Sequence, residues 1–598
     1  MPENIIALDL ETTGLDPHHD KVRLAQLYDG TEVKIHDVFA RPETMDELVL
    51  LVEDSNILKV GHNLKFDLSF IRHHAGRRLQ FKNCWDTMLG EQVLSAGWSF
   101  PYPDKNGEVK KRMLEYSLQA LVMRHLGFKL EKDMQRSNWG SKELTEEQLK
   151  YAARDVEVLL PLQEIQSRLL DDNELFEVAQ LEFETLGPVV EMEYHGLPVD
   201  WEAAEELRRR KKEELVEALR DLEKEARGKQ TSRQTTLFGG DAGVDINFRS
   251  PAQITKYLKK LGFDVDSSDV ETLKGLDHPF CEKLLKYRTI EKHLNFIDQF
   301  EEYGGKNGRI YPNYSQARTA TGRMSSSRPN GQQIPKRGDG RIFRTLFKVQ
   351  RGYRMVKVDY AAVEMRVMAR LAMDKAMIEA IQNGVDLHKL TASKTSHKTM
   401  EEVTKDDRQK AKAVNFGLIY GMSAPTLKSY AWFNYGVKMT DQEAENTRSA
   451  FFDLYKGIAN WHDRQKRKIQ TKIPYYVHTY KDGYFNYSVV AQTTVFGRKR
   501  FWPDYLHQTM AKPTEYFNSA DQGTSADITK LSLVRLYKEL PEEAHIIGAI
   551  HDEILVECPE DIAPEIAQVV KRVMCEEGSK ILAPVPVDAE ETLGDAWG

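Results

Sequence analysis

Cysteine is scarce in this chain, with four residues among 598 and no CxxC pair. Cys84, Cys281, Cys558 and Cys575 are too few to cross-link a chain of this length. We therefore expect four reduced thiols in core or surface positions, with no disulfide and no cysteine-ligated metal.

Long apolar runs are also missing. Stretches such as "HIIGAI" fall well short of the roughly 20 residues that a membrane-spanning helix needs. Folded-looking sequence begins at Asn4, which leaves no room for a signal or transit peptide. A cytosolic protein is expected.

A strong charge of one sign is likewise absent, since the formal net charge is −8 at pH 7. That total argues only weakly against nucleic-acid binding, because it says nothing about local patches. Basic clusters occur at 208–212 ("RRRKK") and 464–468 ("RQKRK"), although each alone is more typical of a solvated helix face. The length predicts roughly three to five domains and allows more than one active site.

The pattern along the chain changes several times. Residues 1 to about 170 mix short strands ("IIALDL", "KVRLAQLY", "ILKVGHN") with helices, as in α/β domains. A long charged helix is expected over 201–227, then a polar loop, then helices to about residue 300. Strands follow at "MVKVD" and "HIIGAIHDEILVEC", separated by a largely helical insert over about 375–470. There is no internal repeat.

Acidic residues recur in the first part at spacings that favour a shared site. Asp9 and Glu11 lie on one face of a strand, where each raises the pKa of the other. Asn63 and Asp67 are four residues apart on an expected helix face, and Tyr151 and Asp155 have the same spacing. Any one of these patterns alone is more often a strand end or an ordinary helix face.

Together, Asp9, Glu11, Asp67 and Asp155 would form a cluster that is stable only around cations. Hard oxygen ligands favour Mg²⁺ or Mn²⁺. Two such ions, roughly 3.5–4 Å apart, can activate a water and stabilise the leaving oxygen of a phosphodiester. Tyr151 would orient that water.

A second pair of aspartates lies far along the chain. Asp359 ends an alternating strand just before a helix, and "IIGAIHDEILVE" predicts a hairpin with His551, Asp552 and Glu553 at or near its turn. If the strands are neighbours, Asp359 and Asp552 face each other. They would bind a second pair of divalent ions, with the backbone carbonyl of Tyr360 as a further ligand.

Between these aspartates, "DDRQKAKAVNFGLIYGM" places Arg408, Lys412, Phe416 and Tyr420 at every fourth position, drifting only about 40° per step around a helix. Gly421 is expected to end this helix as a cap. Two cations suit a triphosphate, and the aromatic rings offer a stacking platform for a base. The alternative is an amphipathic helix whose basic residues are simply solvated.

The first set of motifs resembles the three motifs of 3′→5′ exonucleases with four metal-binding carboxylates and a tyrosine, and includes "WDT" at 85–87. The second set resembles the polymerase motifs of the family A DNA polymerases, the bacterial DNA polymerase I type. Further segments resemble the same family: "TATGRMSSSRPNGQQIP", "TVFGRKRFWP", "NSADQGTSADITK", "NFRSPAQI" and the terminal "GDAWG". The resemblance covers essentially the whole chain from residue 4.

This resemblance implies a multidomain α/β and α+β fold. An RNase H-like exonuclease domain is expected at 1–170, followed by a right-hand polymerase. The connecting helix and thumb would span 171–310, the palm 311–374 and 481–598, and the fingers 375–480. No separate 5′ nuclease domain is expected ahead of Met1.

The resemblance also implies roles for individual residues. Asp359 and Asp552 would hold metal ions with Glu553 beside them, and Glu364 would exclude ribonucleotides by filling the space of a ribose 2′-OH. The expected dNTP-binding residues are Tyr360, Glu364, Arg408, Lys412, Phe416, Tyr420 and His388. The expected DNA-binding residues are Arg323, Asn330, Gln332, Asn518, Gln522 and His551 in the polymerase and Asn63 in the exonuclease. Several would contact the minor groove, where base pairs present nearly equivalent acceptors.

The sequence therefore predicts a DNA polymerase with 3′→5′ proofreading, two Mg²⁺ or Mn²⁺ ions per site, and primer-template DNA and dNTPs as partners. It is expected to be a monomer. The alternatives are a nuclease with an inactive polymerase half, a non-catalytic DNA-binding scaffold and a single-subunit RNA polymerase. Departures from the family pattern at Ala361, Ala362, Gly331, Gln333 and Thr514 concern template grip and remove no expected metal ligand.

One loop has a pattern of its own. Within the polar insertion at 229–245, Gln234, Leu237 and Phe238 form a QxxLF pattern that resembles peptides that dock into sliding clamps. An exposed Leu-Phe pair requires a partner, and a clamp would raise the local concentration of enzyme at DNA. The alternative is a thumb tip that merely brushes the duplex.

Overall fold

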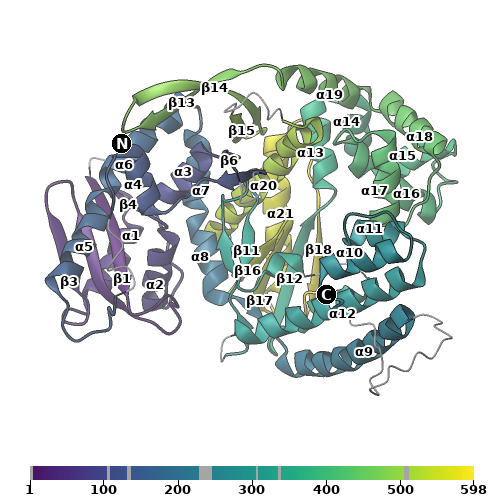
Figure 1. Ribbon diagram of the computed structural model, residues 1–598. Coiled ribbons are helices and arrows are strands. Elements are labelled where there is room, and N and C mark those ends of the chain that lie inside the picture. Colours follow the sequence, from purple (N-terminus) through teal and green to yellow (C-terminus); the bar gives the residue numbers. More distant parts are fainter. Residues whose placement is uncertain are drawn as a thin grey trace.

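The computed structural model describes residues 4–103, 108–130, 137–227, 246–304, 307–334, 338–503 and 511–598. An N-terminal α/β domain lies to one side of a larger body, and a β-hairpin connects the two along one edge (Figure 1). All four cysteines are free thiols, as predicted. Across the described ranges, no helix is both long and apolar enough to span a membrane.

The N-terminal domain is built on a five-stranded sheet in the order β3-β2-β1-β4-β5. Its strands are β1 (Asn4–Thr12), β2 (Val22–Tyr28), β3 (Val33–Asp37), β4 (Ile57–Gly61) and β5 (Cys84–Asp86). In β1, buried Leu8 and Leu10 alternate with half-buried Asp9 and Glu11, so both carboxylates share the face opposite the core. The three strands expected here are confirmed.

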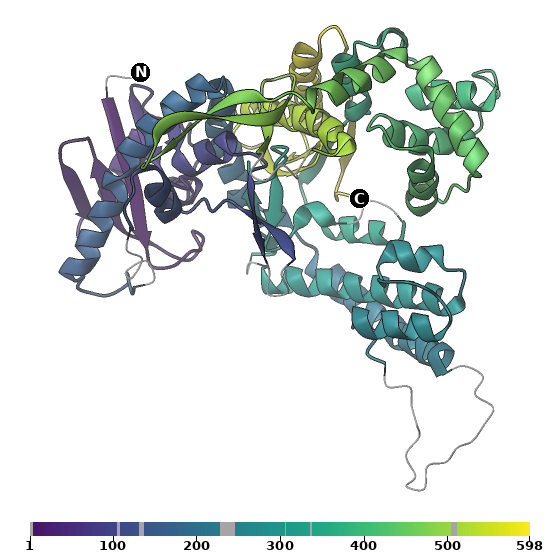
Figure 2. The ribbon, with the colours of Figure 1, turned by 45° about the horizontal axis from the view of Figure 1, so that its top comes forward.

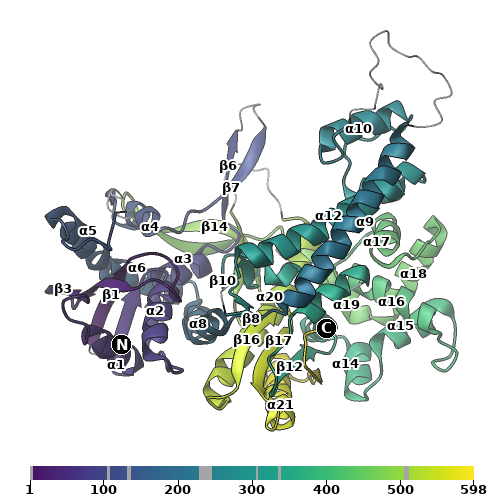
Figure 3. The same cartoon turned by 90° about the horizontal axis from the view of Figure 1, so that it is seen from below.

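Helices surround this sheet, and one hairpin projects away from it (Figure 3). They are α1 (Thr44–Glu53), α2 (Lys65–Ala75), α3 (Thr87–Leu94), the β6 (Ser99–Pro103) and β7 (Val109–Met113) hairpin, α4 (Leu118–His125), α5 (Glu146–Glu157) and α6 (Leu159–Asp172). One expectation is wrong: Asn63 does not share a helix face with Asp67, because α2 begins only at Lys65. The backbone of Asn63 is left-handed, with φ of 57°. Its N–H and that of Leu64 donate to Asp86, which fixes this turn.

The next segment forms a projecting stalk. The stalk consists of α9 (Trp201–Arg227), α10 (Pro251–Lys260), α11 (Val270–Gly275) and α12 (Pro279–Glu302). It is preceded by α7 (Phe176–Glu184) and α8 (Leu186–His195), which pack into the cores of the two halves, and by β8 (Leu197–Pro198), which pairs with β9 (Arg309–Ile310) after the stalk. The long helices α9 and α12 pack along each other, and α10 lies near their far end (Figure 3). The helix predicted over 201–227 is confirmed. The loop with Gln234, Leu237 and Phe238 lies outside the described residues.

The larger body is centred on an antiparallel sheet in the order β16-β17-β12-β18. Its strands are β12 (Tyr353–Tyr360), β16 (His545–Ile550), β17 (Glu553–Pro559) and β18 (Ala589–Gly594). Helix α21 (Ala563–Leu582) packs on β12 and β18, and α20 (Pro513–Glu539) packs on α21. The expected neighbouring strands are confirmed, with Asp359 directly opposite Glu553. Beside the sheet lie β10 (Asn313–Ser315), β11 (Ser325–Ser327) and the short 3-10 helices η1 (Gly331–Gln333) and η2 (Gly338–Leu346).

The predicted helical insert is also confirmed. It follows α13 (Val363–Ala372) and contains α14 (Lys375–Gln382), α15 (Leu387–Ser396), α16 (Lys405–Leu418), α17 (Ala424–Tyr435), α18 (Asp441–Leu454) and α19 (Lys456–Lys468). Helix α16 ends earlier than expected, so Tyr420 lies in the turn after it. Gly421 has φ of 76°, and a Cβ there would lie 2.9 Å from the ring of Phe517. This close approach to α20 fixes the position of the turn.

A third sheet joins the two halves. Strands β13 (Ile473–Thr479), β14 (Gly483–Thr493) and β15 (Lys499–Pro503) extend from the larger body over the N-terminal domain (Figures 1 and 2). The backbone N–H of Tyr476 donates to the Asn173 side chain at 2.9 Å, and the Asn173 amide donates to the Tyr476 carbonyl at 2.8 Å. Tyr480 N also donates to Arg124 O at 3.1 Å. The sequence did not predict that this segment reaches the other domain.

Four buried charged side chains link helix α7, the segment before β15 and helix α20. Glu182 in α7 accepts from Arg498 at 2.6 Å and from Lys530 of α20 at 2.5 Å, and Arg498 also donates to Asp527 at 2.7 Å. All four side chains are at most 4% exposed. Each charge is paired, as a buried ion must be to remain ionised.

Replacing Glu182 with Ala should therefore be costly. Glu182→Ala leaves Lys530 and Arg498 without their shared carboxylate, and we expect the free energy of unfolding to fall by about 3–5 kcal/mol. Urea unfolding followed by tryptophan fluorescence measures the change. Glu184→Ala is the control, because the contacts of Glu184 with Lys538 and Gln180 are exposed and their loss should cost about 1 kcal/mol or less. Equal losses in the two variants would contradict a stabilising role for the network.

Candidate active sites

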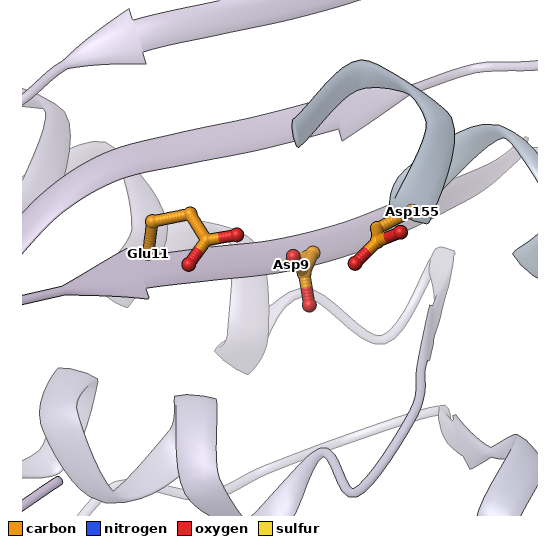
Figure 4. Close-up of side chains that lie close together, drawn as sticks. All are labelled: Asp9, Glu11 and Asp155. Carbon is orange, nitrogen blue, oxygen red and sulfur yellow. The ribbon is translucent and has the colours of Figure 1, made fainter. Parts of the chain in front are cut away.

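The N-terminal sheet carries a cluster of carboxylates. One oxygen each of Asp9, Glu11 and Asp155 lies within 4.8 Å of the others. Asp9 and Glu11 come from β1 and Asp155 from α5, with Asp9 in the middle (Figure 4). Helix α5 starts at a capping box formed by Thr145 and Gln148, which fixes the turns that carry Tyr151 and Asp155.

The fourth predicted acid lies beside this group. Asp67 comes from the first turn of α2, and its carboxylate accepts the N–H of Leu10 at 3.0 Å. Burial and the neighbouring Asp9 raise the pKa of Asp67. The four acids are thus brought together, with three in mutual contact range and Asp67 adjoining them.

The electrostatics of this cluster favour a bound cation. Burial, and then Asp155, raises the pKa of Asp9 to about 8. Burial, Asp9, Asp155 and Asp67 raise the pKa of Glu11 to about 10. Without a cation, these groups therefore hold protons at neutral pH. Because every donor is a carboxylate oxygen, the set fits Mg²⁺ or Mn²⁺.

The cluster opens into a cavity of about 950 Å³. Asn63 and Tyr151 line it together with Asp9 and Asp155. Burial and the neighbouring Asp155 raise the pKa of Tyr151, so its hydroxyl stays protonated. The "WDT" motif has a clear structural role, because Asp86 caps α3 through Met88 and also holds Asn63 at 3.1 Å.

The second pair of aspartates meets at the palm-like sheet. Asp359 lies in β12 and Asp552 in the turn between β16 and β17. The backbone oxygen of Asp552 accepts the N–H of Tyr360 at 3.2 Å. His551 occupies the same turn with φ of 59°, a left-handed conformation that few residues other than glycine adopt. Strands far apart in sequence thus bring Asp359 and Asp552 together.

Glu553 is held from two sides. It is 2% exposed, and its carboxylate accepts from Arg344 at 3.1 Å and from the indole N–H of Trp597. Trp597 belongs to the terminal "GDAWG" segment and is fully buried. These contacts give both residues a structural role, and a catalytic role for Glu553 stays a prediction.

The basic helix presents the predicted side chains on one face. In α16, Arg408 is exposed and Lys412 and Phe416 are half-buried, whereas the residues at 413–415 are buried. Arg408 pairs with Asp386 at 2.6 Å. His388 joins this face: its ring lies 5.7 Å from that of Phe416 and bonds to Asn415. Burial lowers the pKa of His388 to about 4, although the nearby Asp386 carboxylate opposes this shift. The imidazole is therefore neutral at pH 7.

Glu364 lies at the start of α13, within reach of three groups. Arg323 contacts it at 3.1 Å. Burial, followed by Asp521 and Glu364, raises the pKa of Tyr420. Asp521 was missed by sequence reasoning: it is fully buried, and no described group donates to either of its carboxylate oxygens. Burial and Glu364 raise its pKa. No apolar run marks this position in the sequence, because Asp521 stands among the small and polar residues of "NSADQGTS".

The predicted DNA contacts converge on the same region. Between residues 516 and 530 of the largely buried α20, Asn518 and Gln522 are the two half-buried positions, one helical turn apart. Arg323, Gln332 and His551 line a small cavity beside them. Asn330 caps η1 by accepting from the Gln332 N–H at 3.1 Å. Arg323, Gln332 and His551 are therefore brought together beside α20, and their contact with a DNA minor groove stays a prediction.

Comparison with known proteins decides the family. The profile described as "DNA polymerase family A" matches residues 216–598, and that described as "3'-5' exonuclease" matches residues 2–171. The chain belongs to DNA polymerase family A. The predicted DNA polymerase with a 3′→5′ exonuclease domain is thus confirmed.

Relatives of this polymerase extend the match over nearly its whole length. It is 32% identical to DNA polymerase I of Aquifex aeolicus, over 99% of this chain and 95% of that protein. It is 28% identical to DNA polymerase I of Pseudomonas aeruginosa, of which it spans 63%. The structure of the POL domain of Pol1 from M. smegmatis, in complex with DNA primer-template and dNTP, matches with a TM-score of 0.76 at 24% identity, over 99% of this chain and 95% of that chain. The predicted exonuclease-then-polymerase fold is confirmed.

The polymerase should release protons when its exonuclease site binds a divalent ion. The pKa of Asp9 is raised from 3.8 to about 8, so the protonated form stabilises the metal-free fold. That stabilisation is complete below about pH 3.8 and is lost as the pH rises through about 8. At pH 8, adding Mg²⁺ should therefore raise the melting temperature and displace protons.

Titration calorimetry in buffers with different ionisation enthalpies measures this release. Asp155→Asn removes one source of repulsion, so Asp9 should bind fewer protons and fewer should be released. Asp171→Asn, an exposed change in α6, is the control. The interpretation fails if Mg²⁺ binding displaces no protons at pH 8.

Proposed function

We propose that the chain extends a DNA primer with dNTPs on a template and removes mispaired 3′ ends at a separate site. The observation that carries this proposal is the presence of two acidic sites on different sheets. Asp9 and Glu11 lie on β1, whereas Asp359 and Asp552 lie at β12 and the β16–β17 turn. Two separate sites allow primer extension and removal of 3′ ends to use different sets of metal-binding carboxylates.

In the polymerase site, the chain's own residues bind and orient the substrates. Arg408 and Lys412 bind the triphosphate, and Phe416, Tyr420 and His388 shape the pocket for the nascent base pair. Glu364 excludes the 2′-OH, and the Tyr360 carbonyl completes the oxygen set with Asp359 and Asp552. Arg323, Asn330, Gln332, Asn518 and Gln522 hold the primer-template, and His551 positions the primer end. Glu553 supports this site from β17.

In the exonuclease site, Asp9, Glu11, Asp67 and Asp155 supply the negative charge that holds cations. Tyr151 orients the attacking water, and Asn63 contacts the DNA strand. Two Mg²⁺ or Mn²⁺ ions per site supply, when bound, the positive charge that activates the attacking oxygen and neutralises the leaving group. The raised pKa values of Asp9 and Glu11 support such ions here.

Four further proposals accompany this function: the domain bounds, the location, the oligomeric state and a clamp contact. The exonuclease domain spans 1–170, the connecting helix and thumb 171–310, the palm 311–374 and 481–598, and the fingers 375–480. The enzyme acts as a cytoplasmic monomer on primer-template DNA. A sliding-clamp contact through Gln234, Leu237 and Phe238 rests on the sequence pattern alone.

The two activities should be separable. Asp552→Ala should abolish primer extension yet leave shortening, because the carboxylate sets lie in different domains. Asp9→Ala with Glu11→Ala should do the reverse. A labelled hairpin primer, incubated with Mg²⁺ with or without dNTPs, reports both reactions on one gel.

Matched controls are exposed acids in the same two domains, away from the sites. Asp561 follows β17 and Glu32 precedes β3. Neither Asp561→Ala nor Glu32→Ala should change either activity by more than about twofold. If a folded Asp552→Ala or Asp9→Ala/Glu11→Ala variant loses both activities, the division into two sites is refuted.

Sugar selection is a second test. Glu364→Ala removes the side chain that occupies the 2′-OH position, so ribonucleotide incorporation should rise at least tenfold relative to dNTP incorporation, about 1.4 kcal/mol. Single-nucleotide addition with dCTP and CTP gives the ratio of kcat/KM values. Because Glu364 also contacts Arg323, Glu364→Gln separates volume from charge: it should retain discrimination. Unchanged selectivity in Glu364→Ala would place discrimination elsewhere.

A further inference from the structure

The loop between β10 and β11 has one end at each active site. Asn313 to Gln316 and Arg318 line the exonuclease cavity. Arg323 and Met324 line the small cavity of the polymerase site with His551. A single short loop therefore contributes an arginine to each site.

This loop is fixed in place by the buried ion network. The ammonium of Lys530 donates to the carbonyls of Gln316 at 3.0 Å and Gly322 at 2.8 Å. The Gln316 side chain donates to Glu182 O at 2.9 Å. A Cβ on Gly322 would lie 2.5 Å from Arg498 Nε, so the loop packs directly on the network. Arg318 thus projects from a segment held at both ends.

Arg318 is exposed, and it forms no ion pair with a described carboxylate. The other lysine or arginine among the described residues that line this cavity is Lys65, which pairs with Glu193 at 2.6 Å. Burial raises the pKa of the Tyr116 hydroxyl, and Arg318 opposes that rise, which places its charge near the Tyr116 side of the cavity. Arg318 is therefore available to bind an anion.

We propose that Arg318 binds a backbone phosphate of the single-stranded primer end in the exonuclease cavity. A DNA strand that enters this cavity beyond the carboxylates of Asp9 and Asp155 needs a cation for its phosphates, and Lys65 is already paired with Glu193. A guanidinium meets this need, because its planar donors bond two phosphate oxygens at once. Since Arg318 comes from the polymerase half, that half helps to bind the substrate of the exonuclease. This inference rests on the proposed exonuclease function.

The first test is kinetic. Arg318→Ala should raise the KM for shortening a single-stranded oligonucleotide about tenfold, with kcat within about twofold, because one charged hydrogen-bonded contact is lost. Arg318→Lys keeps the charge but not the paired donors, and should fall between the wild type and Arg318→Ala. Lys34→Ala, which removes an exposed cation from β3 of the exonuclease domain, should leave KM unchanged.

The second test is binding, and it does not require cleavage. In an Asp155→Asn background, the salt dependence of binding to an oligothymidine should weaken for Arg318→Ala, with the log–log slope falling by about 0.7, as for one lost phosphate contact. Equal KM values, or a slope equal to that of Lys34→Ala, would overturn the proposal. If the wild type shortens no DNA at all, the exonuclease function fails instead, and the binding slopes alone decide the role of Arg318.

Discussion

The buried network of Glu182, Arg498, Asp527 and Lys530 is the contact on which the arrangement of this polymerase depends. It joins helix α7, the segment before β15 and helix α20. Lys530 also fixes the β10–β11 loop through two carbonyls. Such a network specifies one geometry, because any other packing leaves a charge buried without a partner. The network therefore helps to hold the two active sites in position with ions that touch neither set of carboxylates.

Much of each site could be predicted from the sequence, because the predictions relied on local periodicity. Asp9 and Glu11 alternate with buried residues in a strand, and Arg408, Lys412 and Phe416 repeat along a helix. These patterns follow from backbone geometry and need no knowledge of distant contacts. The family motifs then supplied the partners that periodicity cannot, such as Asp359 with Asp552.

The features that were missed depend on contacts between distant residues. Asn63 leaves the helix because Asp86 binds its N–H, and Tyr420 leaves α16 because Gly421 packs against Phe517. The partners Glu182 and Lys530 are 348 residues apart. Asp521 is a buried acid whose surroundings come from three other segments. No local sequence pattern predicts these features, because each depends on contacts that form only when distant segments pack together.

The hairpin β13–β14 changes what can be regarded as an independent part of this molecule. The hydrophobic core of the N-terminal domain includes Tyr475, Val489 and Phe501, which all belong to the third sheet. A fragment that ends near residue 171 would lack these side chains and would expose an apolar surface to water. The core of the N-terminal domain is therefore completed by the other half, and a protease that cuts between the halves in sequence would not release two intact domains. Recombination between relatives at this junction would have to carry the hairpin together with the domain that it covers.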